Sequence, residues 1–228
     1  MPIPVFLVAE EMLEEMLDPF YNYYKYVAEK MRKKLKGKID KSLENIIHKY
    51  EPKLGKTLKV RVINFEKNNT VFCFGSPSIH FPNLCVGYIF IENNFRRNFS
   101  KKELEWILLH ETGHIVQGHT IAKLVLQIPE LLESSSLKFI KDSIKLFQLA
   151  KNEIPFEEKI LKTQEFEADE FATNLTNEKV AFSVLSKLQK MSKNISHTTK
   201  IFGVKYPYLF ISERIERVVK NYNYRASI

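Results

Sequence analysis

One segment constrains the fold of this chain more than any other, the run KKELEWILLHETGHIVQGH at 101–119. Ser100 comes just before it, and the pattern SKKE, with Glu103 three residues on, is a capping box that marks the start of a helix. Residues four apart stand on the same face of a helix, so His110 and His114 would lie side by side. The sequence therefore predicts a helix over this run that presents two imidazoles together behind an apolar stretch.

The segment HETGH inside this run fits the H-E-x-x-H pattern, in which two histidines bind one zinc ion. Imidazole nitrogens bind Zn2+ at ~2.0–2.1 Å, and zinc lowers the pKa of its bound water toward ~7. Glu111 follows the first histidine, so its carboxylate would stand beside the metal and accept a proton from that water. The pattern predicts one Zn2+ per chain, with His110 and His114 as ligands and Glu111 as the general base of a zinc peptidase.

A catalytic zinc site needs a third protein ligand as well as an open fourth position. The residue six positions after His114 is Thr120, which offers no imidazole. His119, one position earlier, is expected to point away from the metal face and to lie behind the ligands or cap the helix. The remaining source is the segment TQEFEADEFA, where Glu165 and Asp169 share a helix face. Either can bind zinc while the other orients a ligand histidine.

Small residues indicate how these two helices would meet. Gly113 stands inside the first helix, where glycine costs up to ~1 kcal/mol, and a close approach by another backbone would explain it. Ala168 and Ala172 leave room for such an approach on the second helix. Glu167 lies about 200° round that helix from Glu165, so we expect it on the far face with little effect on the metal.

Glycine and proline are scarce, with 7 and 9 copies among 228 residues, which favours a helix-rich protein over a many-stranded sandwich or barrel. Alternating or β-branched stretches predict strands at 58–65, 70–74 and 85–91. The periodic spacing of apolar residues, together with the glycines and prolines that end helices, predicts helices at 10–36, 40–50, 121–151 (a hairpin), 155–174, 178–192 and 211–222. We expect an α+β chain, with residues 1–55 as an N-terminal helical extension and residues 56–228 as the domain that carries the site.

The formal net charge of +8 raises the question of an anionic partner. The basic residues are spread out among 27 acids, and the densest cluster, KMRKKLKGKIDK at 30–41, is interpreted as a solvated helix end and loop. No nucleic-acid-binding motif is present, so no nucleic-acid partner is expected. No stretch approaches the ~18 apolar residues of a membrane span, and the start lacks the basic region of a signal peptide. These features predict a soluble, cytoplasmic protein without a membrane span.

Together the two segments resemble the HtpX-like and CAAX-prenyl-protease family of gluzincin metallopeptidases. ELEWILLHETGHIVQGHT is similar to the family pattern E-L-x-x-[VI]-L-x-H-E-x-x-H-x-x-x-x-H, whose last histidine matches His119, and EFEAD matches E-x-x-A-D. The resemblance implies a zincin-like domain with a small antiparallel-edged sheet. It also implies that Glu165 is the third zinc ligand and that Asp169 orients a ligand histidine from behind. The strand at 85–91 would then receive the substrate backbone by edge pairing.

The C-terminal region departs from this family, which usually carries His-Pro followed shortly by Arg-Ile. Here the sequence is YPYLFISERI, in which Arg214 matches the arginine and Tyr208 stands at the spacing of the histidine. Both are therefore candidate catalytic residues, and the Tyr208 hydroxyl could donate to a tetrahedral oxyanion or serve ordinary aromatic packing. The family's membrane spans are missing too, which predicts a soluble member and disfavours the prenyl-protein branch.

These patterns together predict a zinc metalloendopeptidase that acts on peptide or protein substrates. The alternative is a latent or non-catalytic regulator that keeps a zincin fold for binding, against which the intact Glu111 counts. The sequence indicates no particular oligomeric state.

Overall fold

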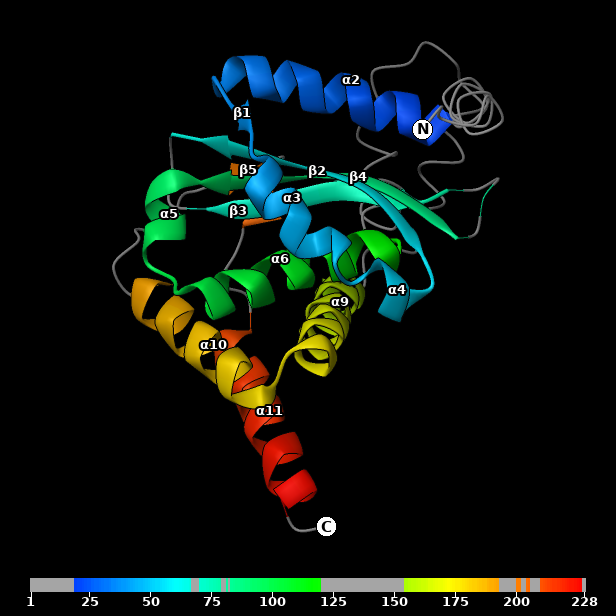
Figure 1. Cartoon of the computed structure of the whole chain (residues 1–228). Helices are drawn as coiled ribbons and strands as arrows, with labels where there is room; N and C mark the ends of the chain where they lie inside the picture. Colours follow the sequence, from blue (N-terminus) through cyan, green and yellow to red (C-terminus); the bar gives the residue numbers. More distant parts are fainter. Residues whose placement is uncertain are drawn as a thin grey trace.

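The computed structural model of the chain describes residues 19–66, 70–78, 81, 83–119, 154–192, 200–201, 204–205 and 210–226. A four-stranded sheet lies in the middle, with one helix on one side of it and several on the other (Figure 1). The described elements are α2 (Pro19–Lys34), β1 (Lys38–Ile39), α3 (Lys41–His48), α4 (Glu51–Leu54), β2 (Thr57–Phe65), β3 (Val71–Pro77), β4 (Leu84–Glu92), α5 (Asn93–Arg97), α6 (Lys101–Val116), α9 (Ile154–Leu175), α10 (Glu178–Ser192), β5 (Lys200–Ile201), β6 (Val204–Lys205) and α11 (Ile211–Ala226).

The main sheet has the order β1-β2-β4-β3. β2 and β4 run parallel, whereas β1 and β3 pair antiparallel to their neighbours, so both ends of the sheet are antiparallel. β4 is thus an internal strand with a partner on each side. The expectation that the strand at 85–91 offers an edge for pairing is wrong for that reason. Its nearly continuous burial is typical of a strand covered on both faces.

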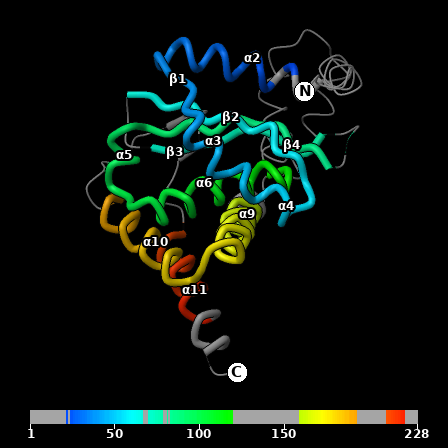
Figure 2. The backbone as a smooth tube through the Cα atoms, viewed as in Figure 1, coloured from blue at the N-terminus to red at the C-terminus, as the bar shows by residue number. Residues whose placement is uncertain are grey.

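Each face of the sheet carries its own hydrophobic core. On one face, α2 packs its Tyr24 and Ala28 against aromatic side chains of the sheet, among them Phe74 and Phe90. On the other face, the strands pack against α3 and α6, and α9 and α10 lie beyond α6. The tube in Figure 2 shows how the chain passes from α2 through β1 to α3, and so from one core to the other. The helix that carries the two histidines is therefore enclosed between the sheet and other helices.

The structure confirms the α+β, helix-rich class, with a small sheet whose edges are antiparallel. The three predicted strands are present, each within three residues of the expected bounds, and the last two helices begin where predicted. The first predicted helix is confirmed over Pro19–Lys34, and the predicted helix at 40–50 is confirmed as α3, with α4 following at Glu51, beyond the predicted end. The expected hairpin at 121–151 lies outside the described residues.

Residues before position 55 share this architecture with the rest of the chain. β1 adds a strand to the sheet, and Leu43 and Ile47 of α3 belong to the larger core. The domain boundary at residue 55 stays a prediction.

Lysines 30, 33, 34 and 36 are exposed, as expected of a solvated helix end and loop. No described helix has the length and apolar composition that crossing a bilayer requires, and the cytoplasmic location stays a prediction.

Candidate metal centre

The helix that carries the histidines is fixed at its start by the capping box that the sequence predicted. The backbone N–H of Ser100 donates to the Glu103 carboxylate at 2.7 Å, and the Ser100 hydroxyl accepts from the Glu103 N–H at 3.4 Å. The same carboxylate accepts from Ser183 at 2.6 Å and pairs with Lys187 at 2.8 Å, both on α10. Burial raises the pKa of Glu103, but Lys187 and these donors outweigh it and lower the pKa to about 2. α6 is therefore joined to α10 at its first turn.

Gly113 marks a close approach of α6 to α9. A Cβ at this position would lie 3.3 Å from the Cα of Ala168 and 3.1 Å from the ring of Phe171. The close approach by another backbone, which the sequence predicted, is confirmed. It brings the acidic segment of α9 alongside the two histidines.

Three candidate ligand side chains from these helices meet in one buried cluster. Nε2 of His110 lies 3.2 Å from Nε2 of His114. The two oxygens of Glu165 complete the triangle, with Oε2 at 3.4 Å from the first ring nitrogen and Oε1 at 3.4 Å from the second. Ligands bound at ~2.0–2.1 Å around a tetrahedral zinc stand ~3.3–3.4 Å apart, so the spacing of these three groups fits a zinc ion. The structure thus brings together all three predicted ligands.

Asp169 lies behind the first ligand, at the position that the resemblance implied. Its Oδ1 is 2.9 Å from Nδ1 of His110. A carboxylate only accepts, so this contact favours a proton on Nδ1 and leaves the Nε2 lone pair for a metal. Burial lowers the pKa of His110, but Asp169 and Glu165 outweigh it and raise the pKa to about 9. Without a metal, His110 would then hold a second proton on Nε2 at neutral pH, and a metal cation, which the same anionic surroundings favour, would displace that proton.

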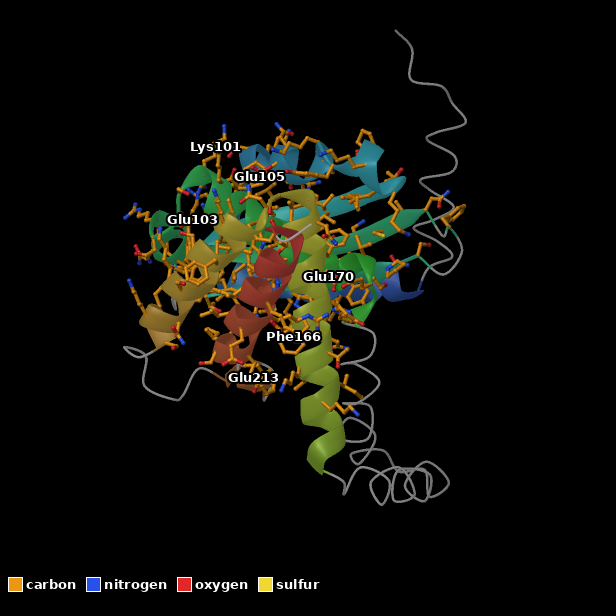
Figure 3. All side chains as sticks on the ribbon, turned by 90° about the horizontal axis from the view of Figure 1, so that it is seen from below. Lys101, Glu103, Glu105, Phe166, Glu170 and Glu213 are labelled. Atoms are coloured by element: carbon orange, nitrogen blue, oxygen red, sulfur yellow. The ribbon has the colours of Figure 1, made fainter. Side chains whose placement is uncertain are left out.

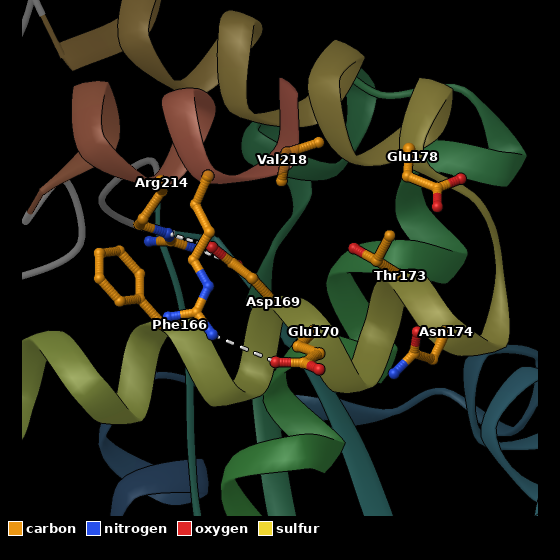
Figure 4. A pocket seen from close by; sticks show the side chains of 9 residues that line it. Phe166, Asp169, Glu170, Thr173, Asn174, Glu178, Arg214 and Val218 are labelled. Atoms are coloured by element: carbon orange, nitrogen blue, oxygen red, sulfur yellow. Dashed lines mark hydrogen bonds and ion pairs between the residues drawn. The ribbon is translucent and has the colours of Figure 1, made fainter. Parts of the chain in front are cut away.

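Arg214 enters this cluster from α11 and is only 2% exposed. Its Nε and Nη2 donate to the two oxygens of Asp169 at 2.7 and 2.6 Å (Figure 4). Its Nη1 lies 2.9 Å from Oε2 of Glu165. Burial alone would raise the pKa of the Glu165 and Asp169 carboxyls. The positive charge of Arg214 and the contacts with the histidines together have the larger effect, so the pKa of each carboxyl is lowered. Burial lowers the pKa of Arg214, but the charges of Asp169 and Glu165 outweigh it and raise this pKa, with a smaller contribution from Glu111, which is 8% exposed.

This geometry fits an arginine that holds two carboxylates in place. Its three described contacts go to Glu165 and Asp169, so a direct contact between Arg214 and a substrate stays a prediction. Tyr208, the other candidate near the C-terminus, lies outside the described residues.

The position of His119 differs from the one that a helix continuing to residue 119 would give it. α6 ends at Val116, three residues before the predicted end, and Gly118 adopts a left-handed φ of 72°. The turn brings Nδ1 of His119 to 2.8 Å from Nδ1 of His114, while its Nε2 lies 3.0 Å from Oε2 of Glu167. His119 therefore does not point away, and it lies behind a ligand. The contact with Glu167 was missed because a helical projection cannot place a residue beyond the end of the helix.

Trp106, which belongs to the apolar stretch before the histidines, is a second contributor to the site. Its ring stacks on that of His110, with centroids 5.5 Å apart and planes at 22°. Its indole N–H donates to the Thr173 hydroxyl of α9 at 3.2 Å. The four-residue spacing between the tryptophan and the histidine is the signal that could have found this contact.

Comparison with known proteins places this site in a family. No curated protein sequence matches the chain. The crystal structure of S. mikatae Ste24p is similar, with 17% sequence identity and a TM-score of 0.48 over 94% of this chain, which spans 57% of that one. Residues 36–220 match the model of peptidase family M48. Because that match covers well over half of the chain, this protein belongs to peptidase family M48, which confirms the resemblance to the HtpX-like metallopeptidases.

Proposed function

We propose that the chain is a zinc-dependent metallopeptidase that hydrolyses peptide bonds in peptide or protein substrates. His110, His114 and Glu165 hold one Zn2+ per chain, and Glu111 is the general base. The observation that carries this proposal is the buried cluster of three candidate ligands, in which Nε2 of His110 and Nε2 of His114 lie 3.2 Å apart and each lies 3.4 Å from an oxygen of Glu165. Two imidazoles and one carboxylate at these distances match the protein donor set of a catalytic zinc site.

The residues around the triangle have distinct tasks. A bound zinc would acidify a water molecule and polarise the scissile carbonyl. Glu111 follows the first ligand on the same helix, so its carboxylate stands beside the cluster and takes the proton from the attacking water. It then passes that proton to the leaving amine. Asp169 and Arg214 keep the ligands oriented, because each contacts a ligand side chain directly.

Metal analysis combined with peptide cleavage tests the proposal. Purified protein should contain about one equivalent of zinc, cleave casein or a peptide library, and lose cleavage when a chelator is added. His110→Ala and His114→Ala should each lose most of the zinc. The control is His48→Ala, because that ring lies on α3 and contacts Glu51 at 3.2 Å. Full zinc retention in either ligand variant would exclude the site.

The base is tested separately with Glu111→Gln, which should keep zinc and fold but lose hydrolysis, because an amide does not accept the proton. Glu105→Gln is the matched control: this carboxylate is on the same helix but contacts Lys49 and Tyr50 (Figure 3 shows it near the start of α6). Unchanged turnover in Glu111→Gln would contradict the mechanism. A wild-type protein that binds zinc and cleaves no peptide would favour the non-catalytic alternative.

A further inference from the structure

Three side chains form a continuous path from the surface to the second metal ligand. Nδ1 of His114 lies 2.8 Å from Nδ1 of His119, and Nε2 of His119 lies 3.0 Å from Oε2 of Glu167. The two rings are buried, whereas the Glu167 side chain is 49% exposed. We propose that Glu167, acting through His119, fixes which nitrogen of His114 carries the proton, and so strengthens zinc binding. This inference rests on the proposed zinc site.

Glu167 lies at the surface end of this path. An ionised carboxylate accepts hydrogen bonds and cannot donate them, so Glu167 favours a proton on Nε2 of His119. In a neutral imidazole, a proton on one nitrogen leaves the other as an acceptor. Nδ1 of His119 then accepts, and its partner at 2.8 Å must donate. That partner is Nδ1 of His114, so the proton of His114 resides on Nδ1.

This proton position is the one that a metal needs. With Nδ1 protonated, the lone pair of His114 is on Nε2, the atom that lies in the ligand triangle. The opposite tautomer would put an N–H into the triangle and exclude the metal from that nitrogen. Asp169 favours the same tautomer of His110. Asp169 thus orients the imidazole of His110 directly, whereas Glu167 orients that of His114 through His119.

Glu167 therefore acts as a positioning residue, and the size of its effect follows from its distance. Loss of a group behind a metal ligand typically lowers metal affinity or activity ~10–100-fold. Glu167 acts through one ring more and is half exposed, so we expect the lower end of this range. A glutamine at this position could accept or donate, and so would no longer favour one tautomer of His119 over the other.

The experiment compares Glu167→Gln with a matched control, Glu170→Gln. Both carboxylates are on α9, and their side chains are similarly exposed, at 49% and 53%. Glu170 contacts Arg217 at 3.3 Å instead of a histidine, and Figure 3 shows it on the side of α9 toward the viewer. Zinc dissociation constants are measured by competition with a chromophoric chelator. We expect an increase of about tenfold for Glu167→Gln and no change for Glu170→Gln.

A second readout follows the proton itself and does not depend on zinc. The 15N chemical shifts of the His114 ring, recorded for the zinc-free protein at alkaline pH, distinguish the Nδ1–H tautomer from the Nε2–H tautomer. Wild type and Glu170→Gln should show mainly Nδ1–H, and Glu167→Gln should show a mixture.

The outcomes separate this inference from the proposed function. Equal zinc affinities for the two variants, or a His114 tautomer that does not respond to Glu167→Gln, would overturn the inference and leave the zinc site intact. A wild-type protein without zinc affinity would refute the proposed function, and the 15N shifts would still decide whether Glu167 controls the tautomer of His114.

Discussion

The guanidinium of Arg214 faces the carboxylate of Asp169 through two parallel hydrogen bonds, with Nε 2.7 Å from Oδ2 and Nη2 2.6 Å from Oδ1. Such a paired contact fixes the plane of a carboxylate as well as its distance. Because Asp169 lies 2.9 Å from Nδ1 of His110, α11 helps to set the orientation of a proposed metal ligand.

Arg214→Lys should weaken zinc binding and destabilise the fold, because an ammonium cannot make both contacts at once. Arg214→Ala should cost more, about 3–5 kcal/mol, since it leaves two buried carboxylates without their partner. Urea denaturation and zinc competition measure the two effects. The control is Arg217→Lys, because that arginine is on the same helix but pairs with Glu170 near the surface, where the expected change is below ~1 kcal/mol. Equal effects at the two positions would contradict the assigned role.

The two acids of α9 should differ in their effect on zinc. Glu165→Gln should abolish tight binding, because a ligand oxygen of the triangle loses its charge. Asp169→Asn should weaken binding only ~10–100-fold, since it acts through His110. Both substitutions keep the side-chain volume, and circular dichroism checks that the fold is retained. A larger loss of zinc affinity in Asp169→Asn would reverse the assignment of ligand and support.

Gly113→Ala should destabilise the protein although alanine is the better helix former. The propensity gain of ~1 kcal/mol is outweighed by overpacking, which typically costs ~1–3 kcal/mol, because the added methyl would lie 3.1 Å from the ring of Phe171 and 3.3 Å from the Cα of Ala168. Denaturant unfolding should show a net loss of about 1 kcal/mol. A variant more stable than wild type would mean that α6 and α9 are not held at this distance.

Glu103 should make stability depend on acid pH. Its pKa falls from 4.5 to about 2 on folding, so its contribution is present above pH 4.5 and is lost as the pH falls toward 2. A shift of this size corresponds to about 3 kcal/mol at most, and we expect ~2 kcal/mol because Lys187 is 42% exposed. Urea unfolding of wild type and Glu103→Gln should differ by this amount at pH 7 and converge near pH 2. A constant difference across this range would contradict the prediction.

The local parts of this structure were predictable from the sequence, because their determinants lie within a few residues. The capping box, the face shared by His110 and His114, and the strand patterns all depend on such short spacings. Gly113 was informative for the same reason, since an unfavourable residue inside a helix requires an external cause.

The parts that depend on long-range pairing were harder to predict. The residue pattern of a strand does not determine which strands pair with it, and β4 was therefore wrongly expected at an edge of the sheet. Its continuous apolar run is typical of an internal strand. The contact between His119 and Glu167 joins residues 48 positions apart and depends on where α6 ends. Gly118 was the available signal for that end, since glycine is common just after a helix.

The contact of Arg214 with Glu165 and Asp169 has a consequence for biosynthesis. A ribosome releases the chain from its N-terminus, so both histidines and both acids emerge well before the arginine that neutralises them. Until α11 docks, two carboxylates in an apolar interior repel each other and favour water over burial. The candidate metal centre of the nascent chain is therefore completed only when α11 docks, because the contacts of Arg214 with Glu165 and Asp169 form at that step.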